Sequence, residues 1–266
     1  MSYAQLKSAK VHYTDINPSP SDVSDTVVFV HGLGSSQNFY IPLTYTLKKV
    51  NRRFILLDSP GAARSPLPAG DVLTVQSLAA TVLELLEHLG VAQNVTIVGH
   101  SMGCLVALHI AQLAPEKVVG LVLLGPVYPS AGLAEVFEKR IPAVKKDGME
   151  SMAAVVPNAA VGVKASPLTR AFIRELLLGQ TVDGYAALCN AIATSTVGDL
   201  SKVKQRVLIV AGSEDKSAPM EGSQKYNEEI ANAELKVIDG VGHWHVVEAP
   251  QEVSTIVDEF LGASTV

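Results

Sequence analysis

The chain has 266 residues, of which 21 are Lys or Arg and 26 are Asp or Glu, so its formal net charge is −5 at pH 7. This balance excludes a protein that binds nucleic acid through a strongly basic face. Although 48% of the residues are hydrophobic, no uninterrupted apolar run approaches the roughly 18 residues of a membrane span, which excludes a transmembrane protein.

Short runs rich in β-branched residues alternate with segments of helical length from Thr26 onward. The predicted elements are strand 26–30, helix 38–50, strand 52–58, helix 74–89, strand 95–99, helix 102–114 and strand 118–124. Thr74 is a suitable N-cap for the helix that follows it, and Gly90 is a suitable residue just beyond that helix. The alternation is typical of an α/β fold with a mostly parallel sheet covered by helices on both faces.

Residues 127–200 break this alternation and contain helical patterns only, over 133–140, 144–155, 168–178 and 184–193. The alternation then resumes with strand 206–212, helix 220–230, strand 234–239 and helix 250–261, and Gly262 is expected just after the last helix. An insertion of this size is small for an independent domain. We therefore predict one domain over 1–266, with a core formed by 1–126 and 201–266 and a helical cap formed by 127–200.

The strand 95–99 runs into Gly99-His100-Ser101-Met102-Gly103 and then directly into a helix. This is the GxSxG pattern in the strand–turn–helix context of a nucleophile elbow. Glycines at 99 and 103 allow the two backbones to approach closely around a strained serine. The free N–H groups of the helix N-terminus favour an anion that forms when the serine attacks a carbonyl carbon.

A serine nucleophile needs a positioned base, and the base needs an acid that fixes its tautomer. Asp215 follows the strand 206–212, and His243 follows the strand 234–239, so both are expected at the edge of the sheet where ligands bind. The order Ser, Asp, His is that of hydrolases with a nucleophile elbow. His245 is an alternative base, and Glu214 is an alternative acid.

Four stretches match motifs of one family in order: HGLG at 31–34, GHSMG at 99–103, the Gly-x-x-Asp-x-x-x-Pro stretch of 212–219 and GxGHxxxxEAP at 240–250. On these motifs the chain resembles a capped α/β-hydrolase. The resemblance implies a mostly parallel sheet flanked by helices, with a small helical cap inserted after the sixth strand. It also implies a serine esterase or lactonase that needs no cofactor and no metal. The loop DSPGAARS at 58–65 departs from the family by carrying Ala63 where many relatives have glycine.

The resemblance assigns roles to individual residues. Ser101 is the expected nucleophile, His243 the general base and acid, and Asp215 the orienting carboxylate. The backbone N–H groups of Leu33 and Met102 are expected to form the oxyanion hole.

The substrate is expected to be a small ester or lactone, because the cap is rich in Ala, Val and Leu and should cover an apolar pocket. The residues expected to line this pocket are Phe39, Val127, Tyr128 and Trp244. Cationic side chains of the cap are candidates for binding a substrate carboxylate if one turns inward, although each is better interpreted as solvated. These are Lys145, Lys146, Lys164, Arg170 and Arg174.

Several alternatives remain open at this stage. GLGSSQ after a strand, followed by a strand that ends in Asp58, is most of a dinucleotide-binding fingerprint, although Gln37 replaces its third glycine. Relatives with the same fold also perform cofactor-free peroxide or oxygen chemistry, acyl transfer or C–C bond hydrolysis. A non-enzymatic small-molecule receptor is a further alternative, because a fold does not fix a function.

Two cysteines, Cys104 and Cys189, are too few for a disulfide framework or a metal cluster and are expected to be buried thiols. The first residues lack the apolar segment of a secretory signal, and the last four match no targeting motif. The expected location is therefore the cytoplasm.

Overall fold

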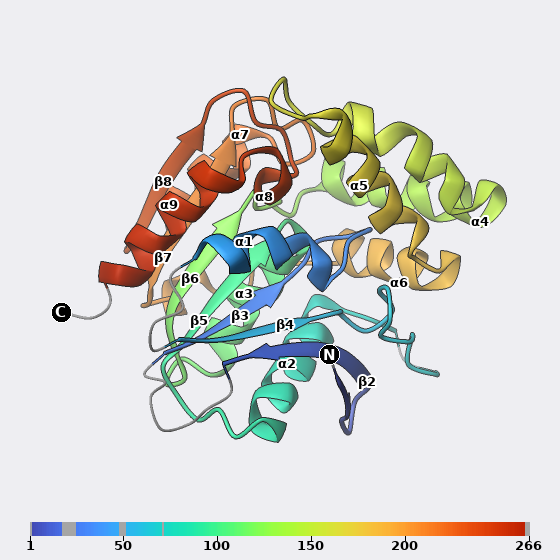
Figure 1. Cartoon of the computed structure of the whole chain (residues 1–266). Helices are drawn as coiled ribbons and strands as arrows, with labels where there is room; N and C mark the ends of the chain where they lie inside the picture. Colours follow the sequence, from blue (N-terminus) through green and yellow to red (C-terminus); the bar gives the residue numbers. More distant parts are fainter. Residues whose placement is uncertain (1, 18–24, 48–51, 71, 264–266) are drawn as a thin grey trace.

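The computed structural model describes residues 2–17, 25–47, 52–70 and 72–263, which form an eight-stranded sheet with helices on both faces (Figure 1). The strand order is β1-β2-β4-β3-β5-β6-β7-β8; the β1–β2 and β2–β4 pairs are antiparallel and the other pairs parallel. The strands are β1 Ser2–Gln5, β2 Lys10–Ile16, β3 Asp25–Val30, β4 Arg52–Leu57, β5 Val95–His100, β6 Val118–Leu124, β7 Arg206–Gly212 and β8 Ala233–Ile238. The predicted α/β class with a mostly parallel sheet is confirmed.

Helices cover the sheet in two layers (Figure 1). α1 (Ile41–Thr46) packs against α9 (Pro250–Gly262) on one face, and α2 (Val75–His88) packs against α3 (Met102–Leu113) on the other. The other elements outside the cap are η1 Gln37–Tyr40, η2 Leu200–Lys202, α7 Met220–Glu229 and α8 His245–Glu248. Thr74 caps α2 as predicted, in a reciprocal pair of hydrogen bonds with Ser77, and Gly90 has the expected positive φ of 69°.

Outside the cap, the predicted elements differ from the structure in three places. The strands β1 and β2 were not predicted, because β2 has only two fully buried positions and its sequence pattern is weak. The helix expected over 38–50 begins as the 3₁₀ turn η1, and α1 ends at Thr46 because Leu47 is extended, with ψ of 142°; residues 48–50 lie outside the described residues. Gly262 is the last residue of α9, and Ala263 follows it as the C-cap.

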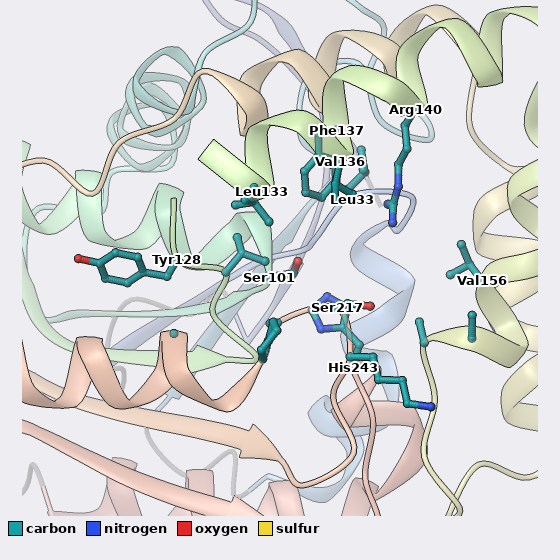
Figure 2. A pocket seen from close by; sticks show the side chains of 18 of the residues that line it. Leu33, Ser101, Tyr128, Leu133, Val136, Phe137, Arg140, Val156, Ser217 and His243 are labelled. Carbon is teal, nitrogen blue, oxygen red and sulfur yellow. The ribbon is translucent and has the colours of Figure 1, made fainter. Parts of the chain in front are cut away.

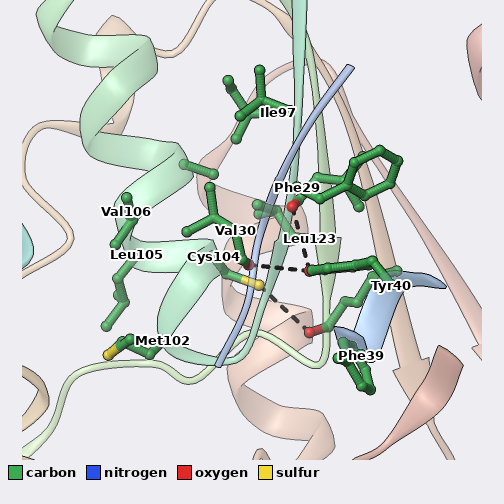
Figure 3. Packing of buried hydrophobic residues seen from close by; sticks show 14 of the residues in the cluster. Phe29, Val30, Phe39, Tyr40, Ile97, Met102, Cys104, Leu105, Val106 and Leu123 are labelled. Atoms are coloured by element: carbon green, nitrogen blue, oxygen red, sulfur yellow. Dashed lines mark hydrogen bonds between the residues drawn. The ribbon is translucent and has the colours of Figure 1, made fainter. Parts of the chain in front are cut away.

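The central strands are buried on both faces, as expected for a parallel sheet between helix layers. Figure 3 shows Cys104 of α3 and Tyr40 of η1 beside the strands in this core. The Tyr40 hydroxyl lies 3.1 Å from the Val30 carbonyl oxygen, and the Cys104 thiol donates to the Gly99 carbonyl oxygen at 3.3 Å. Burial raises the pKa of the Cys104 thiol well above its ordinary value, so this cysteine is an inert core residue.

The cap helices are α4 (Ala131–Ala159), α5 (Pro167–Leu178) and α6 (Val182–Ala193), which lie between β6 and β7 in sequence. They pack against one another beyond the carboxyl ends of the strands (Figure 1). The two helices expected over 133–140 and 144–155 form the single element α4, which continues through Pro142. Its backbone departs from helical geometry at Gly148 instead, where φ is 71° and ψ is −179°, a conformation that glycine adopts without a Cβ clash.

None of the helices in the described part of the chain is both long enough and apolar enough to span a membrane.

Candidate active site

Ser101 lies alone in the turn between β5 and α3, with φ of 53° and ψ of −115°. This conformation is strained for a residue with a side chain. A Cβ at Gly99 would overlap the backbone of Gly103, and a Cβ at Gly103 would overlap the Val30 carbonyl oxygen. The two glycines therefore permit the tight turn, and the Ser101 hydroxyl is held at the N-terminus of α3, at the carboxyl edge of the sheet.

His243 and Asp215 lie side by side in the loops that follow β8 and β7. Nδ1 of His243 is 2.8 Å from Oδ2 of Asp215. The other carboxylate oxygen, Oδ1, accepts hydrogen bonds from the N–H groups of Ser217 and Ala218, each at 2.8 Å. Burial opposes ionisation of Asp215, but His243, His245 and the Ala218 N–H together outweigh burial, so the pKa of the carboxyl group lies below its ordinary value. An ionised Asp215 accepts the Nδ1 proton and leaves Nε2 of His243 available as a base.

The two alternative residues lie in different environments. Oε2 of Glu214 accepts a hydrogen bond from the N–H of Val163, which lies between α4 and α5 in the cap, at 3.0 Å. Nδ1 of His245 is directed at the backbone carbonyl oxygen of His243, at 2.8 Å. The structure therefore brings His243 and Asp215 together and directs Glu214 and His245 elsewhere.

Glu248 fixes the loop that carries His243. Its carboxylate accepts hydrogen bonds from the N–H groups of Gly162, Gly242 and Trp244 at 2.7, 3.0 and 2.8 Å. The His243 N–H donates to the carbonyl oxygen of Ala160, in the cap, at 2.8 Å. The position of the histidine is thus coupled to the segment that follows α4 in the cap as well as to the core.

Two buried histidines contact the backbone of the same loop. Nε2 of His100 and Nδ1 of His245 each lie 2.8 Å from the backbone carbonyl oxygen of His243. Burial lowers the pKa of His245 to about 4 and that of His100 well below its ordinary value. Both rings are therefore neutral at pH 7 and donate one N–H each to this oxygen.

The free energy of unfolding is expected to decrease as the pH is lowered below 6.5, because of His245. Its pKa is lowered from 6.5 to about 4 in the folded chain, so between these values the unfolded chain binds a proton that the folded chain does not. Stability is therefore complete above pH 6.5 and declines toward pH 4, by roughly 3 kcal/mol for this group. Asparagine in His245→Asn keeps an N–H donor near the position of Nδ1 but does not titrate. Urea unfolding at pH 7, 5.5 and 4 should therefore show a decrease in unfolding free energy from pH 7 to pH 4 that is smaller than in the wild type by about that amount.

The matched control for this prediction is His88→Asn. His88 is an exposed histidine at the end of α2, and its replacement should leave the pH dependence of the unfolding free energy as in the wild type. Equal pH profiles for the wild type and His245→Asn would show that His245 is not held neutral in the folded chain.

A cavity of about 700 Å³ lies beside Ser101 and His243, between the sheet edge and the cap (Figure 2). This volume is within the usual range for small-molecule sites, roughly 300–1,000 Å³. Three of the four predicted lining residues line it, namely Val127, Tyr128 and Trp244. The cap contributes mainly apolar side chains, among them Leu133, Val136, Phe137, Val155 and Val156.

The prediction that Phe39 lines this cavity is wrong. Phe39 is fully buried, and its ring packs against the rings of His100 and Trp244, with centroids 4.5 and 5.8 Å apart. Its apolar ring is thus covered by Trp244, which itself faces the cavity. Phe39 supports the wall without forming its surface.

The cap cations suggested for carboxylate binding also lie away from the cavity. Lys145 and Lys146 are exposed on α4. Lys164 pairs with Glu252 at 2.7 Å, Arg174 pairs with Glu150 at 2.6 Å, and Arg170 donates to the Pro157 carbonyl oxygen at 2.9 Å.

The cations that do line the cavity are Arg140, Lys216 and Lys225, and none of them was predicted. The position of Arg140 could have been inferred from the sequence. It follows Leu133 by seven residues and Phe137 by three, a spacing that places all three on one face of a helix. Lys216 lies in the loop between β7 and α7, where no periodicity indicates its direction, whereas Lys225 lies within α7.

The residues predicted for the oxyanion hole flank Ser101. Leu33 lines the cavity, and Met102 is the first residue of α3, with its side chain in the core. Within the described residues, neither backbone N–H donates a hydrogen bond to another protein group. Both donors are therefore available to an oxygen atom bound next to Ser101.

The side chain of Asp58, the acid of the dinucleotide-binding alternative, is hydrogen-bonded to other residues of the protein. It is buried, its Oδ2 lies 2.8 Å from Nδ1 of His12, and its Oδ1 accepts from the Gln37 N–H at 2.8 Å. This carboxylate is not available to a ribose. Among the described residues there is also no group of three or more His, Cys, Asp or Glu side chains that could hold a metal ion.

The chain is similar to proteins of several activities. It is 30% identical over 252 residues to the dihydrolipoyllysine-residue acetyltransferase component of the acetoin cleaving system of Pseudomonas putida, which covers 88% of this chain but only 63% of that protein. It is 27% identical over 208 residues to 3-oxoadipate enol-lactonase 2 of Acinetobacter baylyi, covering 77% of this chain and 76% of the enol-lactonase.

A solved structure and a family model match the chain as well. The structure of a thermophilic esterase from Thermogutta terrifontis matches with a TM-score of 0.89 at 21% identity, covering 99% of both chains. A model of the Alpha/beta hydrolase family matches residues 27–256. The chain therefore belongs to the alpha/beta hydrolase family, and it is an enzyme of that family.

Proposed function

We propose that the chain is a serine hydrolase that cleaves a small, largely apolar carboxylic ester or lactone through an acyl-enzyme. The observation that carries this proposal is the 2.8 Å contact between His243 and Asp215 beside a cavity that Ser101 also lines. The mainly apolar cap side of that cavity favours an apolar substrate. The enol-lactonase and the esterase among the similar proteins support the choice of ester and lactone bonds.

In the first half of the reaction, Oγ of Ser101 attacks the substrate carbonyl carbon while its proton passes to Nε2 of His243. The carbonyl oxygen becomes an anion and accepts hydrogen bonds from the N–H groups of Leu33 and Met102. Asp215 stabilises the imidazolium through Nδ1 without taking its proton. When the tetrahedral intermediate collapses, the bond to the leaving oxygen breaks and His243 protonates that oxygen.

In the second half, a water molecule replaces the departed alcohol. His243 takes a proton from this water, which attacks the acyl carbon and forms a second oxyanion at the same two N–H groups. Collapse releases the carboxylic acid, and the proton returns to Oγ of Ser101. These steps need no metal ion and no organic cofactor.

We also propose that residues 127–200 act as a cap over one domain whose core is 1–126 and 201–266. Support comes from the hydrogen bond between the His243 N–H and the Ala160 carbonyl oxygen, and from the cap residues around the cavity. In this arrangement the cap selects the substrate and the core performs the chemistry.

The test is hydrolysis of a panel of short-chain aryl esters and simple lactones by the purified protein, together with labelling by a fluorophosphonate. Turnover together with labelling of the protein at Ser101 is expected, because a fluorophosphonate reacts with an activated serine. Labelling without turnover would mean a competent serine with a different acyl specificity. Absence of both would favour the receptor or the oxygen-chemistry alternative.

A further inference from the structure

Arg140 is a cation at the active-site cavity without an anionic partner. Figure 2 shows its side chain reaching from α4 into the cavity that Ser101 and His243 also line. The residue is partly buried, and none of the ion pairs formed by the described residues includes it. A partly desolvated guanidinium is more stable with an anion beside it than alone.

The surroundings hold the Arg140 side chain in place. Its guanidinium carbon lies 4.9 Å from the centre of the Phe137 ring, and its charge lies near the Tyr185 hydroxyl, where it opposes the rise that burial causes in the pKa of that phenol. A guanidinium has five N–H donors in a planar fork, more than the neighbouring Tyr185 hydroxyl can accept from, so donors remain for a second group. Both Phe137 and Tyr185 line the cavity as well.

The charge of the cavity has the opposite sign to that of the whole protein. Apart from His243, its lining residues that carry a charge at pH 7 are the cations Arg140, Lys216 and Lys225 and the single carboxylate Glu221. The chain as a whole carries a formal charge of −5. Cations gathered in a concave site attract anions to it. Of the three, Arg140 alone is partly buried, since Lys216 and Lys225 are exposed.

We propose that the substrate is an acidic ester or lactone whose carboxylate is bound by Arg140 while its scissile carbonyl group lies at Ser101. The apolar cap residues then contact the carbon chain between the two groups. This inference rests on the proposed serine hydrolase function and adds a substrate class to it. The carboxylate belongs either to the acyl chain or to the leaving alcohol, and the two arms of the experiment distinguish these sources.

The first arm compares para-nitrophenyl hydrogen adipate with para-nitrophenyl hexanoate, which has a methyl group where the first has a carboxylate. The second compares para-carboxyphenyl hexanoate with phenyl hexanoate. In one arm, Arg140→Gln should lower the ratio of kcat/KM for the anionic ester to that for the neutral ester by roughly ten- to a hundredfold, the range for a hydrogen bond to a charged group. Arg140→Lys should restore part of that ratio, because the charge is kept and the fork is lost.

Arg174→Gln is the matched control, because it removes a cap arginine that pairs with Glu150 away from the cavity; the ratio should stay at its wild-type value. An unchanged ratio in both arms for Arg140→Gln would overturn the inference and leave the serine hydrolase intact. If none of the esters is hydrolysed and the fluorophosphonate does not label the protein, the proposed function fails. Calorimetry with adipate monoanilide then tests whether Arg140 binds a carboxylate. The affinity for this compound should be about tenfold lower in Arg140→Gln than in the wild type, and equal affinities would overturn the inference.

Discussion

Replacement of Ser101 by alanine is expected to lower kcat for any ester that the enzyme hydrolyses by about 10⁴-fold or more. Without Oγ no acyl-enzyme forms, and only the oxyanion donors and substrate binding still favour the attack of water. The folded state should survive, because the Ser101 side chain makes no capping hydrogen bond to α3 and alanine also carries a Cβ at the strained φ of 53°. The measurement is kcat together with the thermal unfolding midpoint.

The control for this prediction is Ser217→Ala, which removes another hydroxyl from the same cavity. Asp215 is bound by the N–H of Ser217 and not by its side chain, so kcat should change by only a few-fold. Ser101→Ala combined with His243→Ala should be no slower than either single variant, because nucleophile and base act as a unit. Wild-type turnover in Ser101→Ala, or multiplied losses in the double variant, would contradict the assignment.

Most of the fold could be predicted from the sequence because the central strands and their helices have clear periods and caps. Thr74 and Gly90 mark the two ends of α2, and both behave as predicted. The failures occur where tertiary contacts decide. β2 gains its stability as a strand from pairing with β4 and carries little signal of its own. The sequence predicts separate helices over 133–140 and 144–155, but α4 continues through Pro142 to Gly148, where a positive φ marks the change of direction.

The candidate site divides in the same way. Ser101, Asp215 and His243 follow strands, and the topology of a parallel sheet brings strand ends together, so their proximity could be predicted from the sequence. The cavity wall could not, because it depends on how the cap lies on the core. Phe39 follows a strand as well, yet Trp244 covers it. Arg140 enters the cavity because of the rotation of α4 about its axis, which periodicity limits but does not fix.

Asp215→Asn is expected to reduce kcat by about 10⁴-fold while the chain remains folded. The N–H groups of Ser217 and Ala218 both donate to Oδ1, so they hold the remaining oxygen of the asparagine there and place its NH₂ group where Oδ2 lies. That NH₂ group faces Nδ1 of His243 across 2.8 Å, and two donors cannot share this contact. The imidazole proton must then move to Nε2, the nitrogen that has to accept the Ser101 proton, and the base is lost. Steady-state kinetics on a good ester substrate measures the loss.

Glu214→Gln separates this effect from a general loss of negative charge in the loop. Glu214 is the adjacent carboxylate and accepts a hydrogen bond from Val163, which the glutamine oxygen can still accept, so kcat should stay within a few-fold of the wild type. The reverse pattern, with a large loss in Glu214→Gln and a small one in Asp215→Asn, would assign the orienting acid to Glu214. Large losses in both variants with an unchanged unfolding midpoint would mean that the loop charge acts on the transition state directly. Only a loss confined to Asp215→Asn supports a carboxylate that works by fixing the tautomer of His243.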